Sequence, residues 1–301
     1  MAPKKVKGPD PRKQKQAYKA MRKRERRSLK IINLPEPSPR KKRVRSNNPE
    51  EKLEPLTIES MRRYDETMVR TDDAEIAAEE RIDEFAAHFR GDREPKLYLT
   101  SSRRPSEKMR RFIKELLLII PNIYYFARDE NKLEDMVRHA TDGGFSAILL
   151  ITQGQGKLPN GLYICSLPYG PTTFFRLTSL LMASDMKGAG SFTESKCEII
   201  LNHFDTRLGR RVGRQIASLF PLDPELEARR VITFHNQRDM IFFRHHRYVF
   251  RNMKKCSLKE IGPRFTLKVH SVQEGTFCLD KGLFEFVWRP DMQVDRKRFF
   301  I

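Results

Sequence analysis

Apolar residues after position 95 fall into two patterns, short runs and stripes with a spacing of three or four residues. Such runs predict strands, and such stripes predict amphipathic helices. The run at 145–152, Phe-Ser-Ala-Ile-Leu-Leu-Ile-Thr, is typical of a fully buried strand. The elements predicted in this stretch are strands at 96–101, 123–126 and 145–152, helices at 106–120 and 132–141, and a hairpin of 161–167 with 172–181.

A second, shorter cycle follows the Gly- and Ser-containing loop at 187–193. Its predicted elements are a strand at 198–202, a helix at 206–220, and strands at 231–235, 240–250, 264–272 and 284–288. Alternation of strands and helices in two successive cycles predicts an α/β fold of two similar halves. We expect one domain over 92–290, with halves at about 95–185 and 195–290.

The residues on either side of this domain have a different character. Residues 1–55 are rich in Lys, Arg and Pro and poor in large apolar residues, which predicts a basic disordered tail. Residues 56–91 predict a helical arm, in which Thr57 caps a first helix and a second helix spans 73–89. Residues 291–301 form a basic C-terminal end.

The charge of the chain is concentrated at its two ends. Over 301 residues, 59 Lys and Arg stand against 39 Asp and Glu, a formal net charge of +20. Residues 1–48 carry a net charge of +15 and residues 229–301 carry +9, so the intervening residues carry −4. Clustered positive charge of this size indicates a polyanionic partner, either nucleic acid or an acidic membrane surface.

Several classes of protein are disfavoured by the sequence. The four cysteines lie 32, 59 and 22 residues apart without a CxxC pair, so we expect reduced thiols and no zinc site. The apolar stretch at 112–125 is too short to span a bilayer, and no signal peptide is visible, so a soluble intracellular protein is expected. The sequence contains no GxxxxGK[ST], GxGxxG, HExxH or GxSxG motif. We therefore expect no enzyme activity, no cofactor and no small-molecule substrate.

The predicted helix at 206–220 has two distinct faces. An apolar stripe of Leu208, Val212, Ile216 and Leu219 faces the core, and the other face consists of four arginines: Arg207, Arg210, Arg211 and Arg214. Like charges at this spacing repel one another, and a phosphate backbone would turn that repulsion into attraction. An ordinary solvated face is the plain alternative, but the absence of acids among these residues favours RNA contact.

Two predicted strands of the second half also present cations. In Arg264-Phe-Thr-Leu-Lys-Val-His270, the apolar residues face one way, while Arg264 and Lys268 face the other. The segment 234–248 interleaves aromatic residues with cations, a combination that stacks on unpaired bases. Exposed strand faces are normally polar, so the alternation alone is a modest signal. The RNA contacts expected here are Arg238, Arg244, Arg247, Arg264 and Lys268.

Histidines near this segment raise two further hypotheses. His245 and His246 are adjacent on one strand and point to opposite faces, so they cannot chelate one ion together, and no metal site is expected. Asp239 with His235 leaves an RNA-processing nuclease as an alternative function. In the tail, the basic cluster at 39–45 is typical both of a nuclear-import signal and of an RNA-binding arm, with Lys41, Lys42 and Arg43 as contacts.

Four segments together resemble the Brix domain. They are Leu-Pro-Asn-Gly-Leu-Tyr-Ile-Cys-Ser-Leu-Pro-Tyr-Gly-Pro at 158–171, Asn-His-Phe-Asp-Thr-Arg-Leu-Gly at 202–209, Ala-Ser-Leu-Phe-Pro at 217–221, and Glu-Ile-Gly-Pro-Arg-Phe-Thr-Leu-Lys at 260–268. The likeness covers roughly residues 56–301. The segment at 251–258 is a loop that is compressed relative to the family pattern.

The resemblance implies a fold of two α/β halves, each like an anticodon-binding module. It further implies a nuclear and nucleolar protein that binds precursor rRNA in early assembly of the large (60S) ribosomal subunit. It implies pre-60S assembly partners, above all the Mak-sixteen protein, and no catalytic residues. The leading hypothesis is therefore an rRNA-binding scaffold that acts in rRNA processing. The alternatives are a Brix protein of small-subunit assembly, a nuclease and a chromatin-binding protein.

Overall fold

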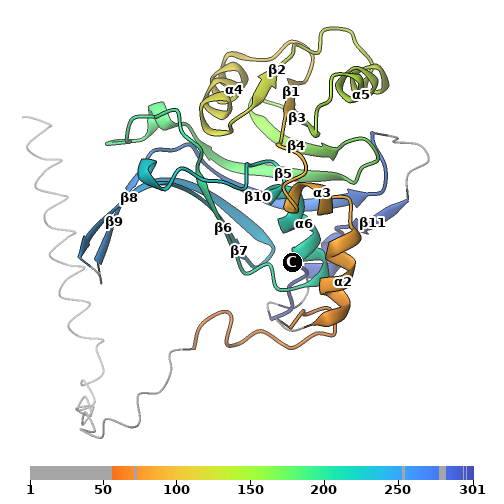
Figure 1. Ribbon diagram of the computed structural model, residues 1–301, viewed down its shortest axis with the longest axis vertical. Coiled ribbons are helices and arrows are strands. Elements are labelled where there is room, and N and C mark those ends of the chain that lie inside the picture. The colour runs from red at the N-terminus through yellow and green to blue at the C-terminus, as the bar shows by residue number, and fades with distance from the viewer. Residues whose placement is uncertain (1–55, 71–72, 253–254, 278–282, 294, 296) are drawn as a thin grey trace, which may run out of the picture. The chain divides into compact units, whose positions relative to one another are not determined.

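The computed structural model describes residues 56–301 except 71–72, 253–254, 278–282, 294 and 296 (Figure 1). The predicted tail, with Lys41, Lys42 and Arg43, lies outside the described residues. The arm contains α2 (Ala74–Ile82) and α3 (Ala86–Phe89). The first half contains β1 (Leu97–Ser101), α4 (Glu107–Ile119), β2 (Ile123–Tyr125), α5 (Leu133–Asp142), β3 (Ala147–Gln153), β4 (Pro159–Ser166) and β5 (Thr172–Leu181).

The second half contains β6 (Glu198–Asn202), α6 (Arg207–Ala217), β7 (Arg230–Gln237), β8 (Met240–Asn252), β9 (Lys255–Glu260), β10 (Arg264–Gln273) and β11 (Phe284–Val287). Three short 3-10 turns complete the described elements: η1 (Ala183–Asp185), η2 (Leu226–Ala228) and η3 (Pro290–Gln293). The mixed α/β class expected from the sequence is confirmed.

One sheet runs through both halves, in the order β2-β1-β3-β4-β5-β10-β8-β7-β6, with β11 paired to β10 and β9 paired to β8. In the first half β1 and β3 are parallel, and β4 and β5 continue the sheet antiparallel. In the second half β6 and β7 are parallel, and β8 and β10 continue it antiparallel. The halves thus share one strand plan, and they meet where β5 pairs antiparallel with β10.

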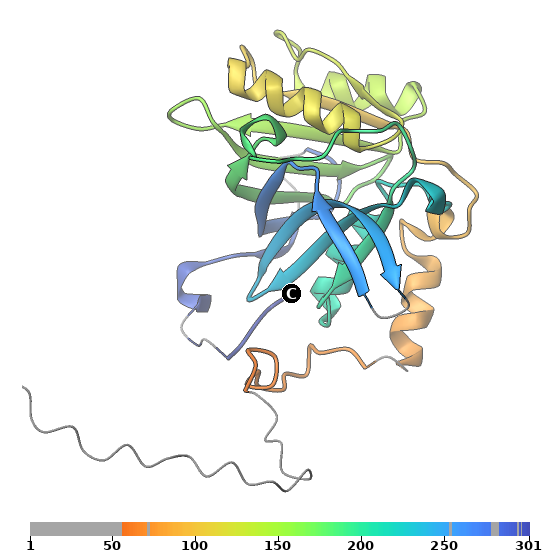
Figure 2. The same cartoon turned by 90° about the vertical axis from the view of Figure 1, so that its left-hand side faces the viewer.

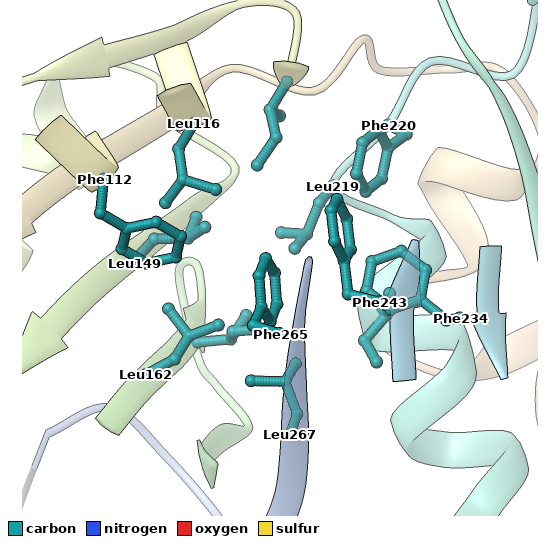
Figure 3. A pocket seen from close by; sticks show the side chains of 13 residues that line it. Phe112, Leu116, Leu149, Leu162, Leu219, Phe220, Phe234, Phe243, Phe265 and Leu267 are labelled. Atoms are coloured by element: carbon teal, nitrogen blue, oxygen red, sulfur yellow. The ribbon is translucent and has the colours of Figure 1, made fainter. Parts of the chain in front are cut away.

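The larger of two hydrophobic clusters joins the halves because aromatic rings bridge them. Phe265 of β10 meets Phe112 of α4 edge-on at 5.6 Å and stacks on Phe243 of β8 at 4.2 Å between ring centroids. Phe243 in turn meets Phe234 of β7 edge-on at 5.2 Å. These side chains surround an apolar cavity of about 30 Å³, with Phe265 between the residues of the two halves (Figure 3).

Helix α6 locks the second half onto the first. The hydroxyl of Thr206 caps its first turn by accepting from the Gly209 amide at 2.8 Å. Val212 and Ile216 are fully buried in the common core. Between them lies buried Gln215, whose amide group donates to the Ile164 and Pro171 carbonyls of the first half at 3.2 and 3.0 Å. The helix therefore makes both apolar and polar contacts across the joint.

Three sequence predictions were wrong in detail. The helix expected at 73–89 is broken at Asp83, whose extended backbone ends α2 and whose carboxylate accepts from the Phe85 amide at 3.1 Å. The helix expected after Thr57 is a turn in which the Thr57 and Ser60 side chains bond each other's amides. After this turn the backbone bonds to a distant segment instead of continuing as a helix, since the Arg63 amide donates to the Lys297 carbonyl at 2.9 Å.

The third error concerns β9, which sequence analysis treated as part of a compressed loop. This strand pairs with the end of β8, for example Leu258 with Tyr248. Its side chains are mostly exposed, so it lacks the buried alternation from which strands are recognised.

Replacing Gln215 by Leu should lower the free energy of unfolding by about 2 kcal/mol, because two buried carbonyls lose their donor while the volume is nearly kept. The measurement is urea denaturation of the purified protein. Gln237→Leu, at a half-exposed position of β7, is the matched control and should change stability by less than about 0.5 kcal/mol. Equal losses in both variants would contradict a bridging role for Gln215.

The stability of the protein should fall as the pH is lowered from 6.5 to about 4 because of His245. Its fully buried ring donates from Nδ1 to the Gly262 carbonyl at 3.0 Å and accepts at Nε2 from Arg230 at 3.3 Å. Burial, together with the adjacent cation, lowers the pKa of His245 from 6.5 to about 4. In this window the unfolded chain binds a proton that the folded chain excludes, so stability rises with pH by up to about 1.4 kcal/mol per unit. His245→Asn keeps a donor and should flatten this dependence in denaturation experiments. An unchanged slope would show that His245 is not its source.

Candidate nucleic-acid interface

The two faces of the central sheet differ sharply in chemistry. Helices α4 and α6 pack on the face that carries Phe175, Phe243 and Phe265. The opposite face, which we call the open face, carries the intervening residues of β5, β10 and β8. In Figure 2 the light-blue strands β8 and β9 lie in front of the teal helix α6, so the side of β8 that is turned away from α6 belongs to the open face. Its residues follow from the strand register.

Cations of neighbouring strands lie side by side on the open face. Lys268 of β10 pairs in register with Arg176 of β5, and two residues earlier Thr266 pairs with Phe242 of β8. Arg244 lies two residues beyond Phe242 on the same side, and Arg176 is exposed. Three strands from both halves of the domain thus supply one positively charged surface.

Burial and neighbouring cations together lower the pKa of the basic groups on this surface, and Glu260 and Asp239 act against the shift. Burial, followed by the nearby charge of Arg264, lowers the pKa of Arg244, and burial lowers that of Lys268, to which Arg176 adds. Burial likewise lowers the pKa of His246, and Arg244 and Arg264 add to the effect. Arg264 is bonded to Glu260, with Nε 2.9 Å from Oε1. Anions placed here would relieve the repulsion among the remaining cations.

A series of aromatic rings lies beside these cations. Tyr163 of β4 stacks on Phe174 of β5 with a centroid distance of 4.3 Å, and Phe174 lies 5.4 Å from His270 of β10. His270 lies 6.0 Å from Trp288, and the Lys268 ammonium is 3.8 Å from the centre of the indole ring. Flat rings next to cations are the surface on which unpaired bases stack.

Arg238 lies at the edge of this surface. It occupies the β7–β8 turn with a positive φ of 54° and lines a cavity of about 240 Å³ together with Trp288, Arg298 and Phe300. Asp239 also lines this cavity. Arg238 and Trp288, at the aromatic end of the open face, thus line the same cavity, and RNA contact by Arg238 stays a prediction.

Arg247 does not belong to the open face. Residues of β8 alternate sides, so Arg247 falls on the side of His245, opposite Arg244. Its Nη2 donates to the Thr193 hydroxyl at 2.7 Å. Arg244 and Arg247 therefore lie on opposite faces, as the alternation along this strand predicts, and RNA contact by Arg247 stays a prediction.

The four arginines of α6 lie together as expected, but each faces a carboxylate of the chain itself. Arg207 lies 3.3 Å from Glu75, and Arg210 lies 2.6 Å from Glu80. The remaining pairs are Arg211 with Glu84 and Glu285, and Arg214 with Glu80 and Asp83. Carboxylates of the arm and β11 therefore offset the repulsion among these charges, which sequence analysis had taken as unmatched. RNA contact by this helix stays a prediction.

Asp239, the residue on which the nuclease alternative rests, holds backbone. Its Oδ1 accepts from the amides of Phe300 and Ile301 at 2.7 and 2.9 Å. Burial raises the pKa of this carboxyl group, although the two amides act against the shift. His235 instead meets His203 edge-on at 5.0 Å. These contacts give Asp239 a structural task in anchoring residues 300 and 301.

Among the described residues, one group brings three ligand atoms within 4.8 Å of one another: Glu59, His203 and Asp205. Two of the three are exposed, and exposed acidic groups commonly lie close together without an ion. The expectation of no metal site stays a prediction. Of the described cysteines, Cys197 and Cys256 are free thiols. In the part of the chain that the structure describes, no helix is both long and apolar enough to cross a bilayer.

Sequence reasoning missed Arg176 and Trp288. Arg176 interrupts the apolar strand Thr-Thr-Phe-Phe-Arg-Leu at 172–177, and this odd charge in a hairpin strand was the signal available. Its pairing with Lys268 depends on the β5–β10 register, which joins segments about ninety residues apart. Trp288 follows a short exposed strand. Its ring contacts arise only when the chain folds, so no local sequence pattern indicates them.

Comparison with known proteins identifies the family. Residues 102–271 match the model of the Brix domain. Ribosome production factor 1 of Danio rerio is 44% identical over 249 residues, which cover 82% of this chain and 75% of that protein. Ribosome production factor 1 of Pongo abelii is 40% identical over 292 residues, covering 96% and 79%. A Brix domain-containing protein of Schizosaccharomyces pombe is 37% identical over 256 residues, covering 82% and 83%.

A solved structure is also similar, the crystal structure of a probable ribosomal biogenesis protein from Aeropyrum pernix K1. It gives a TM-score of 0.44 at 18% identity and covers 58% of this chain and 96% of that chain. The relatives from Danio rerio and Pongo abelii carry the name ribosome production factor 1. The chain belongs to the Brix-domain family.

Proposed function

We propose that this protein is an rRNA-binding assembly factor of the large (60S) ribosomal subunit and that the open face is its RNA-binding surface. The observation that carries the proposal is the register that sets Arg176 beside Lys268, next to Arg244, with aromatic rings along the same face. Cations at strand spacing reach successive phosphates, and the rings accept unpaired bases.

RNA fits this surface better than duplex DNA does. Sequence-specific DNA readers usually place a helix or a two-stranded ribbon in the major groove. Here a broad sheet presents its face, and broad sheets with exposed rings stack the splayed bases of single-stranded RNA loops. The basic tail, with Lys41, Lys42 and Arg43, would add phosphate contacts along the strand.

We also propose a cellular setting for the protein. The names of the relatives, ribosome production factor 1, support a role in ribosome production. We propose that the protein acts in the nucleus and nucleolus, in early pre-60S particles and in rRNA processing, beside the Mak-sixteen protein. Arg238, in the turn between β7 and β8, extends the proposed contact surface. Arg264, at the start of β10, extends it as well.

Reversing the paired cations, Arg176→Glu with Lys268→Glu, should weaken binding to single-stranded RNA about tenfold or more in a filter-binding titration. The slope of log affinity against log salt should become shallower by about 1.4, since each phosphate that is no longer neutralised accounts for roughly 0.7. Lys108→Glu with Lys114→Glu on the exposed side of α4 changes the net charge equally and should have little effect. Equal losses in both double variants would mean that only net charge matters.

Sedimentation of the tagged protein from nuclear extract tests the assignment to a subunit. We expect co-sedimentation with large-subunit precursor particles and enrichment of their rRNA after crosslinking. Recovery with small-subunit precursors, or with genomic DNA, would replace the proposal by the corresponding alternative. Cleavage of precursor rRNA by the purified protein, abolished in Asp239→Asn, would favour the nuclease.

A further inference from the structure

The arginine face of α6 is covered by an acidic segment of the same chain. Residues 73–84, which we call the acidic strap, comprise α2 with its cap and the residues that end it. They contain six carboxylates, at Asp73, Glu75, Glu79, Glu80, Asp83 and Glu84, and one cation, Arg81. The strap and the arginine face are about 130 positions apart in the sequence and oppositely charged.

The ion pairs between them are close and partly shielded from water. Arg214 binds Asp83 through two nitrogens, Nε to Oδ2 at 2.6 Å and Nη2 to Oδ1 at 2.8 Å. The Arg214 and Asp83 side chains are only 17% and 14% exposed. Arg210 donates from Nε to Glu80 at 2.6 Å, and this bond lowers the pKa of the Glu80 carboxyl group. The strap thus matches the arginines in geometry as well as in charge.

Apolar burial contributes little to holding the helix of the strap. Ile76 is the one buried residue of α2, and Ile82 is 85% exposed. The firm apolar attachment begins after the strap, where Phe85 and Ala86 are buried. A nine-residue helix with one buried side chain is only marginally stable once it leaves its partner. The strap is therefore held mainly by charge and is tethered at its C-terminal end.

Carboxylates on a helix and phosphates on an RNA strand compete for the same arginines. Both present oxygen pairs that guanidinium groups bind through two nitrogens. RNA has the additional gain of counterion release when it binds several cations at once. An RNA strand that is already held on the open face or by other cations would have a high effective concentration near α6.

We propose that the arginine face of α6 is a second RNA phosphate site, and that the acidic strap occupies it until RNA displaces the strap. The proposal rests on the proposed RNA-binding function. In the free protein RNA can bind this site only while the strap is displaced. The apparent affinity of the site for RNA is therefore its intrinsic affinity multiplied by the fraction of time for which the site is open. On RNA binding Arg207, Arg210 and Arg214 exchange carboxylates for phosphates, while Glu285 of β11 keeps its contact with Arg211.

Hydrogen–deuterium exchange of the full chain tests the displacement directly. With polyuridylate RNA added to saturation, the amides of 74–82 should exchange faster than in the free protein, because the released helix frays. Amides of α4, which lies away from the strap, serve as the internal reference and should not accelerate. Unchanged or slower exchange in the strap would overturn the proposal.

A variant pair tests the competition. Glu80→Gln with Asp83→Asn weakens the strap and should tighten polyuridylate binding about fivefold, since partly shielded ion pairs are removed on the closed side only. The matched control is Glu134→Gln with Asp142→Asn, two exposed acids of α5 outside the strap, which changes the net charge equally. If both variants bind polyuridylate more tightly by the same factor, the effect comes from net charge alone, and the proposed competition between strap and RNA is rejected.

The same change made in an Arg210→Gln, Arg214→Gln background isolates the site. There the gain from the strap substitutions should vanish, because the cations for which strap and RNA compete are absent. If the increase in RNA affinity persists in this background, the strap substitutions act at a site other than Arg210 and Arg214. If the unaltered protein binds no RNA at all, the proposed function fails. If it binds RNA while the strap stays protected, only the present inference fails.

Discussion

The antiparallel pairing of β5 with β10 is the constraint on which the other features of the domain depend. It joins two halves of similar strand plan into one sheet, and so places residues of both on common faces. On one face it brings Phe265 between Phe112 and Phe243, which unites the core. On the other it sets Arg176 beside Lys268. The core and the candidate RNA surface are consequences of the same register.

Helix α6 has an apolar face and an arginine face. Its apolar stripe and Gln215 pack into the joint between the halves, and its arginines face outward. Helical periodicity forces this division, because residues three or four apart share a face. The outward charge is matched within the chain by the strap and Glu285. The protein thus has one cationic surface that is open and one that its own carboxylates cover.

Periodicity in the sequence predicted most elements of the domain, because burial imposes it. Strands such as β3 and β10 and helices such as α4 bury one face or both, so their apolar positions recur regularly. The prediction failed where burial is slight. Strand β9 is largely exposed, and α2 has one buried residue, so its interruption at Asp83 left no apolar signal. The alternation in β8 predicts that Phe242 and Phe243 cannot both be exposed, and the structure buries Phe243 and leaves Phe242 half-buried.

The candidate site was predictable only in part, for a physical reason. The charge alternation of β10 identified Lys268 and Arg264 from local sequence alone. The pairing of Arg176 with Lys268, and of Arg214 with Asp83, depends on contacts between residues 92 and 131 positions apart. No local pattern encodes such a partner. The arginines of α6 therefore looked unmatched in sequence although the fold supplies their counterions.

Mapping of protein–RNA crosslinks by mass spectrometry in purified precursor particles tests the central claim most directly. The account predicts crosslinked peptides from β5, β8 and β10, including the segments around Arg176, Arg244 and Lys268. Crosslinks confined to the tail at 1–55 or to α4 and α5, with none on these three strands, would contradict it.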